Sequence, residues 1–304
     1  MTHRLNLILL ALILAVGLPY YWFLLDNSGQ SLPPKPVTIE QLRQLAASIP
    51  GEAPYAVEME RAAFRRLPGD LMVAGSGVKR KLVGYMAFRL PVRGGKPVMI
   101  ESGITPDIAA AQNAEQFNLS AQKRIDREMD GAGLILVTHE HPDHLGALAA
   151  HGGPALQLAA WLNPRQLAAK LPWNGSLPPA RLNGTMPQAV APGIVVIPAP
   201  DSHTPGSQLI YVRLADAREF LFAGDNSSFA QNWIQLRGRS RLIETWFAPE
   251  NRAEVFAWLK TIRALRAQSP ELLVVPGHDW EWLANPENHT GVEIGFPGAP
   301  QPYQ

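Results

Sequence analysis

The stretch LILVTHEHPDH at residues 134–144 places four metal-ligand-type side chains directly after an apolar run. The apolar residues predict a buried strand. Because side chains alternate in direction along extended backbone, His139 and His141 point to the same side. Asp143 and His144 begin the next predicted helix and turn toward a second point. Burying several imidazoles and a carboxylate together is costly without a cation or complete hydrogen bonding, so the spacing predicts a metal site. A polar loop without metal is the alternative.

The same placement recurs three times further along the chain. Strand-like runs at 194–197, 220–222 and 272–275 are each followed shortly by a ligand-type side chain. These side chains are His203, Asp225 and His278. Each alone is an ordinary turn or surface residue. If the strand ends share one edge of a sheet sandwich, five histidines and two aspartates converge on one cleft.

These motifs resemble the metallo-β-lactamase-fold hydrolase superfamily over roughly residues 54–290, in its glyoxalase-II-like and lactonase-like branch. The resemblance rests on His-x-His-x-Asp-His at 139–144, His-Thr-Pro-Gly at 203–206, Gly-Asp at 224–225 and Pro-Gly-His at 276–278. It implies an α/β fold of the αββα sandwich type, in which helices flank two packed sheets and a two-metal site lies at one edge.

The resemblance also implies a ligand set. His139, His141 and His203 would bind the first metal. Asp143, His144 and His278 would bind the second, and Asp225 would bridge both. Two Zn²⁺ ions per chain are expected because zinc suits imidazole and carboxylate ligands; iron or manganese stays open.

The implied reaction is hydrolysis by a metal-bound hydroxide, which attacks an ester, thioester or lactone-type acyl bond of a small molecule. Asp143 would also steer or shuttle a proton. A phosphodiesterase on the same two-metal site is one alternative, and a metal-binding member of the fold without catalysis is another. Quorum-quenching lactonases usually carry a Tyr three positions after the bridging Asp, where this chain has Ser228. That departure argues against hydrolysis of homoserine lactones.

Composition narrows the class of protein further. The chain has 304 residues and no cysteine, which excludes disulfide scaffolds, thiolate zinc sites and cysteine nucleophiles. The net charge is +1, so no nucleic-acid partner is expected. We interpret the basic stretch RGRSR at 237–241 as a solvated loop.

Glu140 and Asp279 stand next to ligands, where they either accept hydrogen bonds from imidazoles or face solvent.

The N-terminal segment predicts a membrane anchor. Residues 5–25 carry no charge, and as a helix they would extend roughly 32 Å, enough to span a hydrocarbon core. Arg4 precedes the segment, so the positive-inside rule places the remainder on the exported side, periplasmic or extracellular. The alternative is a cleaved signal peptide and a secreted protein.

Three segments follow from these patterns. Residues 1–25 form the anchor or signal segment, 26–53 a linker and a short helix capped by Thr38, and 54–304 the hydrolase-like domain. Within the domain, 71–74 reads as a strand. The pair Thr105-Pro106 reads as the start of a helix that continues toward Met129.

Overall fold

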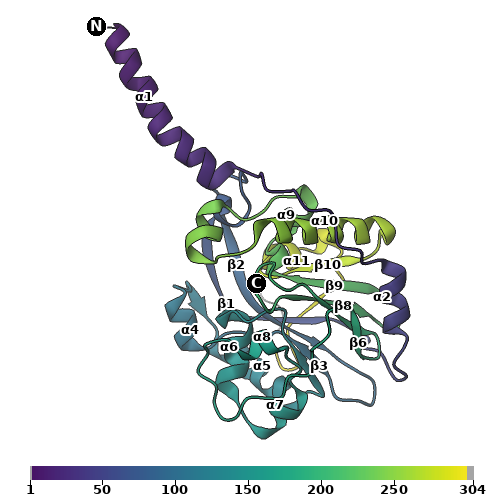
Figure 1. Cartoon of the computed structure of the whole chain (residues 1–304). Helices are drawn as coiled ribbons and strands as arrows, with labels where there is room; N and C mark the ends of the chain where they lie inside the picture. The colour runs from purple at the N-terminus through teal and green to yellow at the C-terminus, as the bar shows by residue number, and fades with distance from the viewer. Residues whose placement is uncertain (1, 300–304) are drawn as a thin grey trace.

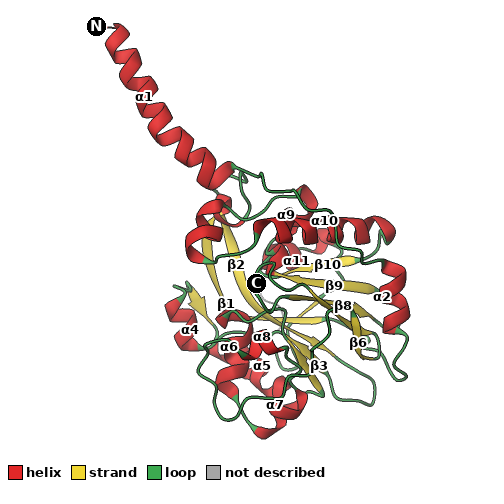
Figure 2. Ribbon diagram, in the orientation of Figure 1, coloured by secondary structure: helices red, strands yellow, loops and turns green. Residues whose placement is uncertain are grey.

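The computed structural model describes residues 2–299, except for the side chains of residues 154–156. Residue 1 of the predicted anchor segment and residues 300–304 of the predicted domain lie outside the described residues. Two β-sheets pack face to face, and helices cover their outer faces (Figures 1 and 2). This is the αββα arrangement expected from the motifs.

The first sheet has the strand order β11-β1-β2-β3-β5, with β4 paired to β1. Its strands are β1 (Glu58–Pro68), β2 (Arg80–Leu90), β3 (Val98–Ile100), β4 (Gln116–Phe117), β5 (Leu134–Leu136) and β11 (Glu293–Ile294). The second sheet has the order β10-β9-β8-β7-β6. Its strands are β6 (Gln188–Ala191), β7 (Ile194–Pro198), β8 (Gln208–Arg213), β9 (Glu219–Gly224) and β10 (Leu273–Pro276).

Helices connect and cover these sheets. The longer ones and the helical turns that matter for the site are α1 (Thr2–Tyr20), η1 (Tyr21–Leu25), α2 (Ile39–Ala46), α3 (Gly69–Met72), α4 (Pro106–Ala111), α5 (Leu119–Gly131), α6 (Pro142–His151), η2 (Asp225–Ser227), η3 (Ile243–Phe247) and α10 (Arg252–Gln268). The remaining ones are α7 (Pro154–Ala159), α8 (Pro164–Leu167), α9 (Ala230–Gln235), α11 (Trp280–Ala284) and η4 (Pro286–Asn288).

The core has three layers of buried apolar side chains, as four layers of structure require. Between the sheets, the rings of Phe88 and Phe222 pack edge to face with centroids 5.0 Å apart. Outside the first sheet, Met99 packs in a cluster with Ile125 of α5. Outside the second sheet, Leu221 lies in a cluster with residues of α2 and α10. Burial on both faces of each sheet fixes the positions of the strand ends.

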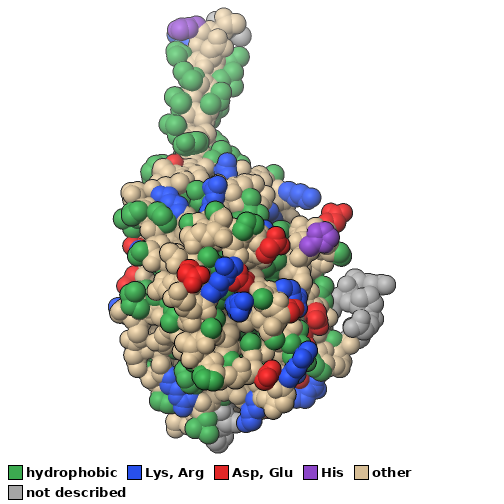
Figure 3. Space-filling model, turned by 90° about the vertical axis from the view of Figure 1, so that its right-hand side faces the viewer, with side chains coloured by type: hydrophobic (Ala, Val, Ile, Leu, Met, Phe, Trp, Pro, Cys, Tyr) green, Lys and Arg blue, Asp and Glu red, His purple; other side chains and the backbone are tan. Residues whose placement is uncertain are grey.

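The N-terminal helix stands apart from this body. Helix α1 projects from the end of the domain opposite α7 (Figure 1), and its side chains are exposed. Hydrophobic side chains cover it, whereas charged ones are spread over the body below (Figure 3). Residues Thr2–Leu25 are long and apolar enough to cross a membrane, and an N-terminal signal sequence would meet the same description.

Two sequence-based expectations about elements were wrong. Residues 71–74 are not a strand, because α3 ends at Met72 and a tight turn follows, in which Asp70 Oδ1 accepts a hydrogen bond from Gly77 N at 2.5 Å. The helix that begins at Thr105 does not continue to Met129. It ends at Ala111, and a second helix, α5, starts after its own N-cap, Asn118.

Candidate metal centre

The predicted ligands follow strands that end at one edge of the sandwich. In the second sheet, β7, β9 and β10 run in the same direction, because β7 and β9 are both antiparallel to β8 and β10 is parallel to β9. Their carboxyl ends therefore share an edge, and His203, Asp225 and His278 follow these ends. In the first sheet β5 is parallel to β3. The 139–144 motif follows β5 and faces the same cleft.

The structure brings all seven predicted ligands together in two groups. The first comprises His139, His141, His203 and Asp225, and the second Asp143, His144 and His278. Within each group, one ligand atom per residue lies within 4.8 Å of the others. That these atoms bind metal stays a prediction.

The first group has three imidazole nitrogens around one point. His141 Nδ1 lies 3.1 Å from His139 Nε2 and 3.1 Å from His203 Nε2. Asp225 Oδ2 lies 3.5 Å from His203 Nε2 and 3.9 Å from His139 Nε2. Nitrogen ligands of a tetrahedral zinc ion with Zn–N distances near 2.05 Å are about 3.3 Å apart, so the spacing fits.

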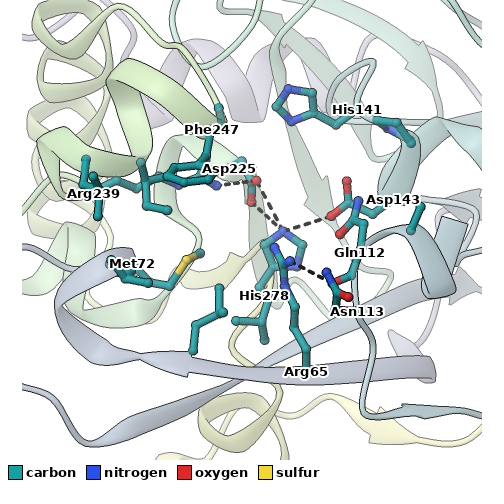
Figure 4. A pocket seen from close by; sticks show the side chains of 18 residues that line it. Arg65, Met72, Gln112, Asn113, His141, Asp143, Asp225, Arg239, Phe247 and His278 are labelled. Atoms are coloured by element: carbon teal, nitrogen blue, oxygen red, sulfur yellow. Dashed lines mark hydrogen bonds and ion pairs between the residues drawn. The ribbon is translucent and has the colours of Figure 1, made fainter.

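The second group meets the first at Asp225. His278 Nε2 lies 3.1 Å from Asp225 Oδ1, 3.7 Å from Asp143 Oδ2 and 3.4 Å from His144 Nε2. The side chains of Asp143, Asp225 and His278 point toward one another, and His141 lies across the opening (Figure 4). Asp225 thus occupies the position between the two groups that a bridging ligand requires.

Acceptors behind the imidazoles fix which nitrogen faces the cleft. His278 Nδ1 donates to the carbonyl oxygen of Gly84 at 2.8 Å. His139 Nδ1 lies 3.1 Å from the Thr138 hydroxyl, which itself donates to Glu101. A carbonyl only accepts, and the Thr138 hydroxyl already donates its proton to Glu101, so Nδ1 of His278 and of His139 each carries the ring proton. Both Nε2 atoms therefore present lone pairs to the centre.

Two more imidazoles have carboxylates behind them. His144 Nδ1 lies 3.2 Å from Glu101 Oε2, and His203 Nδ1 lies 2.7 Å from Glu250 Oε2. With the Nδ1 protons so held, His139 and His203 both face His141 Nδ1 with lone pairs. One proton on His141 can serve only one of them, whereas a cation at this point would satisfy all three nitrogens. The donor set therefore fits a bound metal ion.

Burial and charge set the protonation of the metal-free site. Burial, together with neighbouring cationic side chains, holds the pKa of His139 and of His203 well below the ordinary value of 6.5. Burial opposes ionisation of Asp225, but Arg239 and His278 hold the pKa of that carboxyl well below its usual range. Burial also acts against His144, yet Glu101 raises its pKa to about 9. Neutral imidazoles and an ionised aspartate are the forms that bind metals, so His139, His203 and Asp225 are in the binding form, whereas His144 would lose its proton when a metal binds.

Arg239 is a site residue that the sequence analysis missed. The interpretation of 237–241 as a solvated loop was wrong at this position, because the Arg239 side chain is buried and donates to Asp225. It also donates to Ser228 Oγ at 2.6 Å, and Ser228 donates to Asp225 Oδ1 at 3.2 Å. No local pattern in a run of alternating arginines separates the buried guanidinium of Arg239 from the half-buried ones of Arg237 and Arg241.

The acceptors behind the histidines also differ from those considered beforehand. Glu140 accepts from Thr204 Oγ1 at 2.7 Å, and Asp279 accepts from the backbone amides of Ala230 and Trp282, so both organise turns. Glu101 instead contacts His144 directly and His139 through the Thr138 hydroxyl. A signal for it existed, because Glu101 directly follows β3 just as the ligands follow their strands.

A glycine permits the close approach of the last ligand loop. A Cβ on Gly277 would lie 2.5 Å from Asp225 Oδ1 and 2.9 Å from the Gly224 carbonyl oxygen. Real Cβ atoms do not come so close to backbone. The Pro-Gly-His motif thus needs glycine so that His278 can reach Asp225.

A cavity of about 600 Å³ opens over this centre. His141, Asp143, Asp225 and His278 line its polar part (Figure 4). Its other walls are largely apolar and come from α3, β1 and η3; they include Leu67, Leu71, Met72, Leu242, Ile243 and Phe247. A cavity of this size and polarity suits a small-molecule ligand.

No family model matches the chain, and no curated protein matches it. Solved structures do. A quorum-quenching N-acyl homoserine lactone lactonase superposes with a TM-score of 0.57 at 16% identity, covering 76% of this chain and 94% of the lactonase. An N-acyl homoserine lactone hydrolase with the product N-hexanoyl-L-homoserine at its catalytic metal centre gives 0.56 at 17% identity, with 76% and 96% covered.

A third match is a probable metal-dependent hydrolase from Staphylococcus aureus, with a TM-score of 0.54 at 11% identity, covering 76% of this chain and 91% of that one. At identities this low, the structural likeness establishes the fold alone. The chain has the αββα fold of the metallo-β-lactamase superfamily, as its motifs predicted. The activities named for the matched proteins describe those proteins and not this chain.

Proposed function

We propose that the protein is a dinuclear metal-dependent hydrolase that cleaves an ester, thioester or lactone-type acyl bond. One observation carries the proposal: two groups of ligand-type side chains share Asp225 at the floor of a cavity sized for a small molecule. The likeness of the fold to lactone hydrolases supports it. A protein that kept the fold without catalysis would have little need for the complete set of seven.

The two ligand groups support an assignment of the two metal positions. His139, His141 and His203 would hold one ion, the Asp143 group the other, and Asp225 both; zinc suits these donors best. Such a pair of ions supplies Lewis-acid polarisation and makes a water acidic enough to ionise near neutral pH.

Asp143 is the candidate for proton transfer among the cavity residues. Burial raises the pKa of its carboxyl, but His144, His278 and His141 outweigh burial, and the pKa is lowered. Asp143 is therefore ionised at neutral pH. It can accept a proton from an attacking water and return it to the leaving oxygen or sulfur of the substrate.

A phosphodiester is the second candidate substrate, because two guanidinium groups line the cavity. Arg239 contacts Asp225, and Arg65 donates through Nη1 to the Gln112 carbonyl oxygen at 2.9 Å. Among the described residues, the buried Arg65 Nε has no hydrogen-bond partner. Guanidinium groups suit phosphate oxygens, so a substrate anion would satisfy this donor.

We further propose that Thr2–Leu25 anchors the protein in a membrane with its domain on the exported side. Length, apolar composition and exposure of the helix support the anchor, and Arg4 before the span supports the orientation. Fractionation tests this: the full chain should stay with membranes after a salt wash. A soluble mature form that begins near Asp26 would indicate a cleaved signal peptide.

The test of the hydrolase combines metal analysis with an activity panel. The purified chain should contain about two metal equivalents, and a chelator should abolish turnover that zinc then restores. The panel compares chromogenic esters, thioesters, lactones, β-lactams and a phosphodiester. As the matched pair, Asp143→Asn should lose activity and Asp216→Asn, on the surface, should keep it. Full activity of the metal-free chain would end the proposal.

A further inference from the structure

We propose that the substrate is a membrane lipid, whose acyl chain enters the cavity from the bilayer along the wall formed by α3 and η3. This rests on the proposed hydrolase and on the proposed anchor. The observation that supports it is that α3 and η3 both form a wall of the cavity and contact the foot of the anchor. The foot is defined as η1, residues Tyr21–Leu25, together with Tyr20.

The foot of the anchor is attached to the elements that wall the cavity. Tyr20 Oη donates to Asp70 Oδ2 of α3 at 3.2 Å, and the ring of Phe23 lies 4.9 Å from that of Trp246 in η3. Leu71 and Met72 of α3 and Ile243 of η3 line the cavity. The residues that contact the foot, Asp70 and Trp246, are therefore within one helical turn of residues of α3 and η3 that line the cavity.

The attachment leaves little freedom for the domain to swing away from the membrane surface. Arg241 Nε lies 2.7 Å from Asp26 Oδ2, and its guanidinium stacks 4.2 Å over the ring of Trp22. Arg252 Nη2 donates to the Asp26 carbonyl oxygen at 2.8 Å, and Asn27 Nδ2 donates to that of Leu236 at 2.8 Å. The cavity thus keeps a fixed position relative to the end of the span.

The rim of the cavity on this side is aromatic and exposed. Phe247 lines the cavity and is 73% exposed, and its neighbour Trp246 is 57% exposed. Tyr21 and Trp22 on the foot are exposed as well. Large aromatic side chains on a water-facing surface have an unfavourable hydration cost, which insertion at the lipid interface removes. The bilayer surface is therefore the partner that fits this rim.

The cavity then divides between the two ends of an amphiphile. The apolar wall of Leu71, Met72 and Ile243 suits an alkyl chain, whereas Asp143 and His278 lie on the polar side. Hydrolysis of an acyl ester there adds water across the acyl C–O bond: the hydroxyl goes to the acyl carbon, and a proton goes to the departing alcohol oxygen. The products are a fatty acid and an alcohol, with no other reactant.

Photocrosslinking tests lipid contact without any reference to activity. The full chain, with a benzophenone amino acid in place of Phe247, is reconstituted in phosphatidylcholine vesicles, irradiated and analysed by mass spectrometry. The control carries the same group at Leu177, which is also exposed but lies on the loop whose Ser176 bonds to α7, away from the anchor. Lipid adducts at 247 and not at 177 support the proposal. Absence of adducts at 247 in membrane-bound protein overturns it.

Kinetics separate this proposal from the proposed function. The metal-loaded full chain in vesicles is given a short, water-soluble ester and a long-chain ester embedded in the bilayer. Trp246→Ser, outside the cavity lining, should lower turnover of the embedded ester about tenfold and leave that of the soluble ester unchanged, because it weakens insertion of the rim and the contact with Phe23 but alters no side chain that lines the cavity. Turnover of the soluble ester alone, even by the unaltered chain, refutes the lipid substrate. Turnover of neither ester refutes acyl-ester hydrolysis itself.

Discussion

Glu101 places Oε2 3.2 Å from Nδ1 of His144, and its other oxygen accepts from the Thr138 hydroxyl that contacts His139. One carboxylate therefore orients one imidazole in each of the two ligand groups. Glu101 holds this position with a backbone φ of 64°, a left-handed conformation that is uncommon for residues other than glycine. Such strain persists where the surroundings, or the function, require it.

Replacing Glu101 with Gln should weaken metal binding. The amide keeps the size of the side chain but removes the charge that faces His144, so affinity should fall about 10- to 100-fold, as is typical for partners of ligating histidines. Titration against a chromogenic chelator measures the affinity. Glu115→Gln, on an exposed carboxylate paired with Arg66 and Arg80, is the control. Equal affinities for the two variants would show that Glu101 does not support the ligands.

Asp225→Asn should remove the bridge between the ligand groups. The amide keeps one weak oxygen ligand and removes the nearer of the two carboxylates that face the buried Arg239, so that only Glu250, 3.8 Å away, remains. We expect loss of at least one metal ion and a fall in turnover of about 100-fold or more, beyond the effect of losing a ligand's partner. Elemental analysis and steady-state kinetics, with circular dichroism as a check of folding, measure this. Retention of two ions and normal turnover would mean that Asp225 is not the bridge.

The ligands could be predicted from the sequence because their signal is local and chemical. Each of His203, Asp225 and His278 follows a strand-like run, and parallel strands bring such ends to one edge. Arg239 could not be predicted, because its burial depends on contacts with Asp225, Ser228 and Glu250, which lie elsewhere in the sequence. The packing of the foot of the anchor could not be predicted either, because nothing near Phe23 in the sequence points to Trp246, 223 positions away.

The errors in secondary structure have local causes. The run 71–74 is short and apolar, and periodicity does not separate a strand from a helical turn at that length. The break between α4 and α5 depends on Asn113, whose φ of 55° ends the first helix, and on Asn118, whose side chain caps the second. Both are asparagines, which tolerate the left-handed region and cap helices, and they are the signal that was available.

Breaking the ion pair between β1 and α5 should destabilise the fold. Glu60 is fully buried and bonds Arg124 through both oxygens, at 2.7 and 3.0 Å, and it also accepts from the amide of Phe296. Glu60→Gln removes the buried carboxylate that bonds two nitrogens of the Arg124 guanidinium, and breaking a buried pair in this way costs about 3–5 kcal/mol of unfolding free energy. Urea unfolding of the full chain in mild detergent measures the difference.

The matched control for this variant is Asp216→Asn. Asp216 pairs with Arg218 at 2.8 Å, but both side chains are about half exposed, so the change should stay within about 1 kcal/mol. A loss for Glu60→Gln no larger than that of the control would show that the buried pair contributes little beyond an isosteric neutral contact.

Glu219 should make the stability of the second sheet depend on pH in the acid range. Burial raises the pKa of its carboxyl, but hydrogen bonds from Arg43, Tyr211 and Ser269 outweigh burial, and the pKa lies below the ordinary 4.5. The unfolded chain then binds the proton more readily than the folded one. The contribution of Glu219 is therefore complete above about pH 4.5 and is lost as the pH falls through the folded-state value.

Glu219→Gln tests this dependence directly. The amide cannot titrate, so the gap in unfolding free energy between the unaltered chain and the variant should be largest near pH 6 and shrink below pH 4.5. Urea titrations at a series of pH values measure the gap. Glu58→Gln is an informative comparison, because burial raises the pKa of Glu58 despite Arg89, so its gap should shrink toward higher pH instead. A gap for Glu219→Gln that stays constant from pH 6 to pH 3 would show that its carboxylate gains nothing on folding.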